Sequence, residues 1–484
     1  MSPAGRRRGE HRAAQPLPAP AAPVGTASPW PVFWVASIAA FLVSLDTTML
    51  FAAFEPLGRA FPGATAAELS WVLNAYTVVY ATMLIPAGGL ADTHGRKRVF
   101  LAGVALFLAA SAACGLAGSV GALVAARVVQ AVGAALLTPA SLSIVLAAFP
   151  QGRRSVVVSL WGAVGGLAAA VGPSAGSFVI DHFGWPWAFY INLPLGGLAW
   201  WRGRALLAPS PGTGERRRVD GVGMVLLMLA VGAITLAIVE SEAPRWSREE
   251  LLATAAFGLA AGAAFVAWAR RAPAPLVDPA LFRHRSYTCV NLATLAFGTA
   301  FSMMFLGFFF YMTKLWHFSL PQAGLAVTPG PLMVMPTAIV TGRLAARHGH
   351  RPFLVGGALL YACSSLWFLR VPGLEPNYLQ HWLPGLLMSG VAVGLVLPSL
   401  SAAAVSRLPA AHYAVGSAVN QATRQIGSVM GVALTVALLG DAALGRADFD
   451  ALYLLHGALA LLTALLCFPV DTRPRAAAPA VTVT

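Results

Sequence analysis

The stretch Gly88–Arg98, GGLADTHGRKR, decides how the rest of the chain is organised. It lies between two apolar runs, SWVLNAYTVVYATMLIPAGGL and VFLAGVALFLAASAACGLAG, and each is about long enough to cross a bilayer as a helix. A connection this short makes the two helices antiparallel neighbours. The consecutive cations Arg96, Lys97 and Arg98 predict that this segment faces the cytoplasm.

The composition is that of a membrane protein. Of the 484 residues, 58% are hydrophobic and 10% are charged, which leaves more apolar surface than one soluble core can bury. The formal net charge of +14 is expected where cytoplasmic loops collect Lys and Arg, so we expect no nucleic-acid partner. Lys97 and Lys314 are the only lysines, and neither lies in a G-x-x-x-x-G-K-[ST] loop. Metal-ligand spacings are also missing, and we expect no cofactor, no metal and no enzyme activity.

Fourteen apolar segments are candidates for membrane spans, which need about 20 residues each. They are 32–54, 70–91, 99–117, 121–149, 155–180, 186–205, 221–240, 250–268, 288–312, 322–345, 352–370, 380–403, 414–440 and 451–469. With the N-terminal tail inside, 24 of the 32 Lys and Arg residues fall in cytoplasmic segments and six in external ones. One missed helix would invert every later loop, so the asymmetry predicts fourteen spans with both termini in the cytoplasm.

The opening stretch recurs, weakened, 254 residues later as GRLAARHGHRPF (Gly342–Phe353). The first copy follows the second span and the later copy follows the tenth, so a second unit begins at the ninth span. Both units start on the cytoplasmic side, and parallel repeats of this kind are typical of transporters. The predicted organisation is a disordered cytoplasmic tail (1–31), an N-terminal six-helix bundle (32–205), a linker with two additional transmembrane helices (206–287), a C-terminal six-helix bundle (288–470) and a second cytoplasmic tail (471–484).

Six stretches together resemble the motifs of one transporter family. They are the loop Gly88-x-Leu90-Ala91-Asp92-x-x-Gly95-Arg96-Lys97, SLDTT with Asp46, LVAARVVQAVGAA with Arg127, AVGPSAGS with Gly172, Pro173 and Gly176, WPWAFYINLPLG, and NQATRQIGSVMG. The chain resembles the major facilitator superfamily, and within it the fourteen-helix drug:proton antiporters typical of bacterial multidrug exporters. The resemblance implies an all-α polytopic protein of the cell membrane with the major facilitator fold.

The resemblance also gives the opening stretch a second role, that of a gate. Gly88 and Gly95 permit close packing and a tight turn. Arg96 and Lys97 can reach Asp92 or the neighbouring helix ends, a contact made in one conformation and broken in the other. The alternative is a topology anchor, which explains the cations but not the aspartate.

The segment Gly172-Pro173-Ser174-Ala175-Gly176 also matches G-x-S-x-G, the nucleophile elbow of hydrolases. That elbow needs a strand before it, and this segment lies inside a Gly/Ala-rich membrane span. Proline removes a backbone donor and the glycines admit close helix contact, which favours a kinked, tightly packed pivot. The resemblance associates this pivot with antiport.

Asp46 and Arg127 are the clearest candidates for a functional pair. A carboxylate at the centre of a membrane helix costs about 2.5–3.5 kcal/mol, so it should face a cavity or a partner. Counted at about 1.5 Å per residue, Asp46 lies about 22 Å from Pro31 and Arg127 about 9 Å below the external surface, so their depths agree. We expect them to couple. Asp46 would carry a proton, and the alternative is a static structural pair.

Two further charges lie in or near the membrane. Arg424 sits about 15 Å into its helix, where it either binds a substrate anion or locks the two halves, with Asn420 and Gln425 as possible partners. Glu55 lies at the outer end of the first span, and a solvated boundary carboxylate and a role in proton access fit it equally.

The ninth span, FGTAFSMMFLGFFFYMTKLW, is rich in aromatic residues and Met. Lipid contact or internal packing explains such a helix without any site. The resemblance places it on the cavity, where it would offer hydrophobic substrates an adaptable surface. The candidate residues are Phe301, Met304, Phe305, Phe308 and Tyr311.

The sequence thus predicts a secondary active exporter of hydrophobic or amphiphilic small molecules, driven by proton antiport and alternating access. Its partners would be the substrate, protons and the lipid bilayer, and we expect a monomer. A narrow exporter of one natural product or metabolite is the first alternative, since a fold does not fix a substrate. A non-transporting scaffold or sensor is the second, and it would leave the buried charges without a use.

Overall fold

The computed structural model describes residues 28–150, 153–209, 220–241, 246–408, 413–439, 444–470 and 472, and every statement below concerns these residues. This part of the chain is helical, without a strand. The first half contains α1 (Trp30–Ala60), α2 (Ala66–His94), α3 (Arg96–Gly115), α4 (Val120–Ala148), α5 (Arg154–Phe183), α6 (Trp187–Tyr190) and α7 (Asn192–Leu206). The second half contains α10 (Arg285–Phe310), α11 (Leu320–Val327), α12 (Pro329–His348), α13 (Arg351–Arg370), α14 (Leu383–Val405), α15 (Tyr413–Leu439) and α16 (Asp448–Cys467). Between them lie α8 (Gly221–Val239) and α9 (Arg248–Ala269).

Two of the long helices begin at a capping box that can be read in the sequence. The Thr65 hydroxyl accepts from the Glu68 backbone at 3.2 Å, and the Glu68 carboxylate accepts from the Thr65 backbone at 2.9 Å. Ser247 and Glu250 repeat this exchange at the start of α9, at 3.1 and 2.8 Å. Each box satisfies backbone donors that the first turn of a helix leaves free.

Thirteen stretches of the described chain are long and apolar enough to cross a membrane. They include every predicted span except 186–205, which is divided into the four residues of α6 and the fifteen of α7. The chain is thus a multi-pass helical membrane protein, and the fourteenth crossing stays a prediction.

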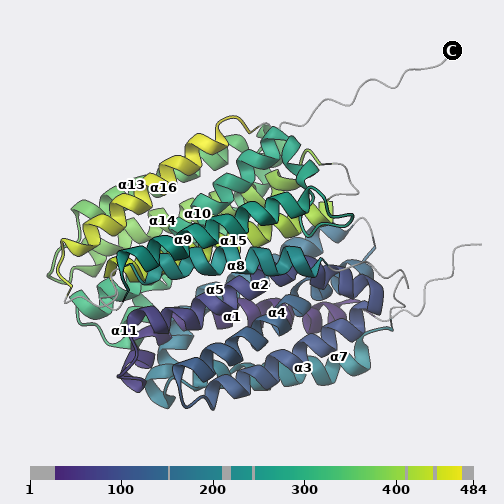
Figure 1. Ribbon diagram of the computed structural model, residues 1–484, viewed down its shortest axis with the longest axis horizontal. Helices are drawn as coiled ribbons and strands as arrows, with labels where there is room; N and C mark the ends of the chain where they lie inside the picture. The colour runs from purple at the N-terminus through teal and green to yellow at the C-terminus, as the bar shows by residue number, and fades with distance from the viewer. Residues whose placement is uncertain are drawn as a thin grey trace, which may run out of the picture.

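The two halves lie side by side (Figure 1). The purple and blue helices α1–α7 form one group, and the green and yellow helices α10–α16 form the other. Across the boundary α2 packs against α15, and α5 packs against α11 and α12. The N-terminal and C-terminal tails, drawn as grey traces in Figure 1, lie outside the described residues. That both are cytoplasmic therefore stays a prediction.

The inserted helices α8 and α9 run along the boundary between the halves (Figure 1). α8 contacts both α2 and α15, and Val231 forms an apolar cluster with Val78 and Val429 from these two helices. α9 packs against α8 and is otherwise mostly exposed to the surroundings. The insertion therefore covers the α2–α15 boundary on one side.

The internal repeat is visible in the backbone at its two glycines. α2 ends at His94 and α12 ends at His348, and each is followed by a glycine with a positive φ, 94° at Gly95 and 78° at Gly349. Glycine adopts this left-handed region without the penalty that a Cβ brings. Both turns then open directly into the next helix, as the repeat predicts.

Helices α10 and α15 pack so closely that glycine is required at their contact. A Cβ on Gly427 would lie 2.5 Å from the carbonyl oxygen of Leu295, and one on Gly431 would lie 2.3 Å from that of Thr299. Small residues at such positions let helix backbones approach within a membrane.

This contact predicts opposite effects of two Gly→Ala substitutions. Gly431→Ala forces its methyl group into the backbone of α10 and should lower the free energy of unfolding by about 1–3 kcal/mol. Gly356→Ala in α13 meets no atom within 4 Å and should leave stability unchanged or raise it, since Ala is the better helix former by about 1 kcal/mol. Thermal unfolding in detergent measures both, and equal midpoints would contradict the close contact.

Candidate functional site

A buried ion pair joins α1 to α4. The Arg127 Nη1 atom donates to Oδ2 of Asp46 at 2.6 Å, and the two side chains are 1% and 0% exposed. The pairing that the depths of the two residues predict is therefore present in the structure. The role of Asp46 as a proton carrier stays a prediction.

Polar side chains from α3, α4 and α7 complete the surroundings of Asp46. Gln130 Nε2 donates to its Oδ1 atom at 2.9 Å, and Asn192 Nδ2 donates to the same oxygen at 3.0 Å. Gln130 Oε1 accepts from Arg127 at 2.6 Å, and its amide also donates to the Ser111 hydroxyl at 2.8 Å. The buried carboxylate thus receives three hydrogen-bond donors.

Arg127 is itself satisfied on several sides. Its Nε atom donates to the backbone carbonyl of Val72 at 3.0 Å, and its guanidinium carbon lies 3.9 Å from the centre of the Tyr76 ring. Both partners belong to α2, so the cluster ties α2 to α1 and α4. The two groups of the ion pair have no access to solvent in this conformation.

The glycines of the expected pivot lie against α1, directly after Asp46. A Cβ on Gly172 would lie 2.0 Å from the Thr48 hydroxyl oxygen, and one on Gly176 would lie 3.0 Å from the Cα atom of Met49. α5 therefore rests on the turn of α1 that follows the carboxylate.

The same part of α5 also contacts the second half. The Ser177 hydroxyl donates to the Pro173 carbonyl oxygen, one turn earlier in the helix, at 2.6 Å. A Cβ on Gly324 of α11 would lie 2.7 Å from that carbonyl oxygen. Pro173 thus sits where α5 meets α11.

The halves also meet where α1 and α10 end, opposite the basic loop. The rings of Phe51 and Phe305 are 5.2 Å apart, and those of Phe54 and Phe310 are 5.4 Å apart. Glu55 borders a small cavity at this contact, and its carboxylate is 33% exposed. It accepts from Arg59 at 2.5 Å.

The aromatic residues of α10 divide into two groups. The Phe301 ring lies 5.7 Å from that of Phe305, which faces α1, and Met304 is buried beside them. Phe308 and Tyr311 instead pack within the second half, where both rings lie about 5 Å from Trp382. Phe308 and Tyr311 therefore pack inside the second half, as in the alternative of internal packing that the sequence leaves open for this span.

Three polar residues of α15 point in different directions. Asn420 donates to the side chains of Asn291 and Thr294 on α10, at 3.2 and 2.9 Å, rather than to Arg424. Arg424 is without a salt bridge among the described residues, and its Nε atom is buried without a hydrogen-bond partner there. Gln425 is half-buried.

The expected gate residues lie at the junction of α2 and α3. A Cβ on Gly88 would lie 3.8 Å from the Pro139 Cβ atom of α4, an ordinary van der Waals distance. Arg96 donates to the Ser143 carbonyl oxygen at 3.4 Å. The side chain of Asp92 lies outside those that the structure describes, and so does its expected contact with Arg96.

Lys97 makes the clearest interaction of this loop. Its Nζ atom donates to the carbonyl oxygens of Arg204 and Leu207 at 2.9 and 2.5 Å. These are the last, unsatisfied carbonyls of α7, where a cation also complements the helix dipole. Asn192, at the other end of α7, contacts Asp46, so α7 connects the loop to the buried ion pair.

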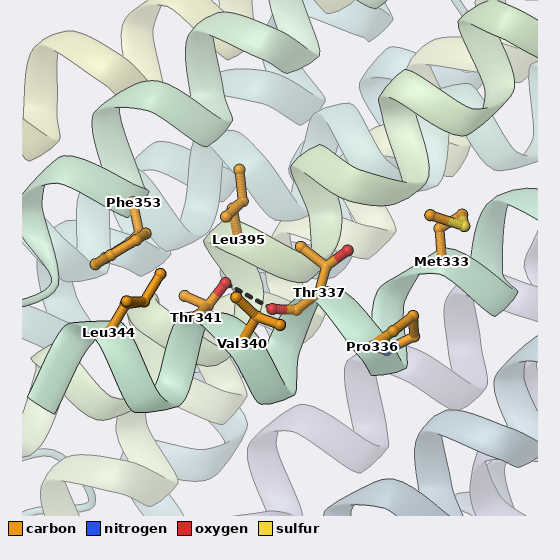
Figure 2. A pocket seen from close by; sticks show the side chains of 8 residues that line it. All are labelled: Met333, Pro336, Thr337, Val340, Thr341, Leu344, Phe353 and Leu395. Atoms are coloured by element: carbon orange, nitrogen blue, oxygen red, sulfur yellow. Dashed lines mark hydrogen bonds between the residues drawn. The ribbon is translucent and has the colours of Figure 1, made fainter.

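A groove of about 270 Å³ lies between α12, α13 and α14 of the second half (Figure 2). Its walls are largely apolar, and Thr337 and Thr341 add two hydroxyl groups. Thr341 donates to the Thr337 carbonyl oxygen at 2.7 Å, which occupies its hydrogen atom. In Figure 2, Leu344 and Phe353 lie together at one end of the groove, and Leu395 lies above its middle.

Solved structures share this fold. The peptide transporter POT, solved in complex with sulfate, superposes with a TM-score of 0.67 over 90% of this chain and 93% of its own, at 17% sequence identity. An auto-inhibited peptide transporter of the POT family gives the same TM-score over 92% and 99%. At such identities the likeness concerns the fold alone.

Curated relatives are more similar in sequence. The methylenomycin A resistance protein of Streptomyces coelicolor is 30% identical, over 81% of this chain and 82% of its own. The tetracenomycin C resistance and export protein of Streptomyces glaucescens is 31% identical, over 85% and 76%. The multidrug export protein EmrB of Escherichia coli is 27% identical, over 83% and 78%. Residues 36–269 and 290–483 match the Major Facilitator Superfamily, and the chain belongs to that family.

Proposed function

We propose that this protein exports hydrophobic or amphiphilic small molecules, drugs and antibiotics among them, in exchange for protons. The relatives named for antibiotic resistance and drug export support the direction and the class of substrate. The buried cluster around Asp46 and Arg127 is the observation that carries the proton coupling. Membership of a family of transporters argues against an enzyme.

Protonation of Asp46 changes the forces within the cluster. A proton on the carboxylate removes the negative charge that Arg127 faces and one of the oxygen acceptors that Gln130 and Asn192 use. A buried cation without its counter-charge is costly, so the protonated site favours an arrangement in which α1 and α4 shift apart. Loss of the proton on the other side of the membrane restores the pair.

Two contacts carry this shift to the rest of the molecule. Gly172 and Gly176 hold α5 against α1 just beyond Asp46, and α5 in turn meets α11 of the second half. At the other end, α7 joins the cluster to Lys97. The loop 95–98 then acts as a gate, and α7 couples it to the protonation of Asp46.

The moving parts in this proposal are the bundles 32–205 and 288–470. Together α6 and α7 make the sixth of fourteen crossings, both termini lie in the cytoplasm, and the protein works as a monomer in the cell membrane. Under that orientation the Phe51–Phe305 and Phe54–Phe310 contacts close the external side. Glu55, beside this closure, is a candidate for proton access.

An exporter of a single natural product is the second candidate. It is favoured by relatives named for one antibiotic each, methylenomycin A and tetracenomycin C. Broad and narrow export predict the same proton site and differ in how many compounds stimulate proton movement.

The first test is Asp46→Asn in proteoliposomes that hold a pH gradient. The amide cannot carry a proton, so release of protons driven by a panel of cationic and neutral lipophilic dyes should fall to the rate of empty liposomes. Asp181→Asn, which neutralises a carboxylate that is 46% exposed near the end of α5, serves as the matched control and should keep the wild-type rate. Full coupled export by Asp46→Asn at normal protein density would exclude the carrier role.

The second test separates the charge pair from its packing. Arg127→Leu leaves Asp46 buried without its cation and should lower the free energy of unfolding by about 3–5 kcal/mol. Adding Asp46→Leu removes the buried carboxylate that has lost its cation, so the double variant should be more stable than Arg127→Leu alone. Thermal unfolding in detergent measures the cycle. Additive losses would show that the two side chains do not couple.

A further inference from the structure

We infer that Gln421, Arg424 and Gln425, here called the α15 polar stripe, form a subsite for the ionised acidic group of an amphiphilic substrate. A carboxylate or a phenolate is the chemical class that fits. The inference rests on the proposed function, which it narrows from hydrophobic molecules in general to those that carry an anionic group.

Arg424 is a half-buried cation within a membrane span, without a counter-charge in the described part of the chain. Its Nε atom is buried and makes no hydrogen bond there. Arg127 shows the contrast, because it has Asp46, Gln130 and a backbone carbonyl around its guanidinium. An uncompensated buried charge is costly, and an anionic ligand removes that cost on binding.

Arg424 lies on the side of α15 that is turned away from the apolar cluster with α8. Val78 and Val429 belong to the apolar cluster with α8, which covers the outer side of the α2–α15 contact. Tyr80 follows Val78 by two residues, about 200° around α2, and so lies on the opposite face, where it bonds Thr138 of α4 at 3.0 Å. Arg424 precedes Val429 by five residues, about 140° around α15, and so is also turned away from the α8 cluster.

The rest of the stripe suits an oxyanion. Gln421 and Gln425 lie three residues before and one after Arg424, both are half-buried, and their amides make no hydrogen bond within the described residues. A guanidinium with neighbouring amide groups can give two or more donors to one carboxylate. The backbone that presents them is fixed, because a Cβ on Gly298 of α10 would lie 2.8 Å from the Arg424 carbonyl oxygen.

The test compares three probes with the same apolar body: pyrenebutyrate, its uncharged primary amide and the cationic pyrenebutylamine. Binding to the full-length protein in nanodiscs is followed by fluorescence anisotropy, and proton release is measured in proteoliposomes. We expect the wild type to bind the acid at least about tenfold tighter than the amide, with the amine weakest.

Substitutions then identify the group responsible. Arg424→Gln should lower the affinity for the acid to that for the amide and leave the affinity for the amide unchanged. Arg424→Lys should keep part of the preference for the acid over the amide. Arg270→Gln, which removes an exposed arginine at the end of α9, is the control for net charge and should keep the full preference. Unchanged binding of the amide shows that each variant is folded.

The outcomes for the subsite and for the exporter are distinct. Equal binding of acid and amide by the wild type, or an equal loss of both in Arg424→Gln, would overturn the anionic subsite, and the second of these would assign Arg424 to holding the halves together. If the amide drives proton release and the acid does not, the proposal of proton-coupled export stands and the anionic subsite is refuted. If the acid binds tightly without any proton release, the subsite stands and proton antiport is refuted.

Discussion

The architecture depends on one constraint, that a charge taken into the membrane interior must be compensated there. Asp46 and Arg127 meet this constraint through each other and through side-chain amides of α4 and α7. These groups come from α1, α4 and α7, so the cluster holds those three helices to one another. In the proposed mechanism, one proton on Asp46 alters how the first half packs.

Part of this could be read from the sequence because it depends on regular quantities. The rise of a helix is constant, so the depths of Asp46 and Arg127 could be compared before their contact was known. Likewise the glycine of a basic loop predicted the left-handed turn at Gly95 and its repeat at Gly349. Thirteen of the fourteen predicted spans followed from the lengths of apolar runs, and the fourteenth stays a prediction.

Other features depend on the direction in which each side chain of a helix faces. Hydropathy does not reveal this direction when all sides of the helix are apolar. Phe305 faces α1 while Phe308, three residues later, packs against Trp382. Sequence reasoning also missed Ser111 and Asn192 as members of the cluster, although Asn192 stood in a recognised motif. The division of the span 186–205 falls at Ile191, between α6 and α7, within an apolar stretch that gave no sign of an interruption.

The place of α8 makes the molecule unequal on its two flanks. Where α2 meets α15, a third helix lies over the contact, whereas the contact of α5 with α11 and α12 has no such cover among the described helices. A molecule dissolved in the bilayer therefore meets two different lateral surfaces. On one, α8 covers the contact between the halves with valine and methionine side chains, and on the other no described helix covers it. For the proposed exporter, the flank without α8 is the one where only the helices of the two halves separate a substrate dissolved in the membrane from their interface.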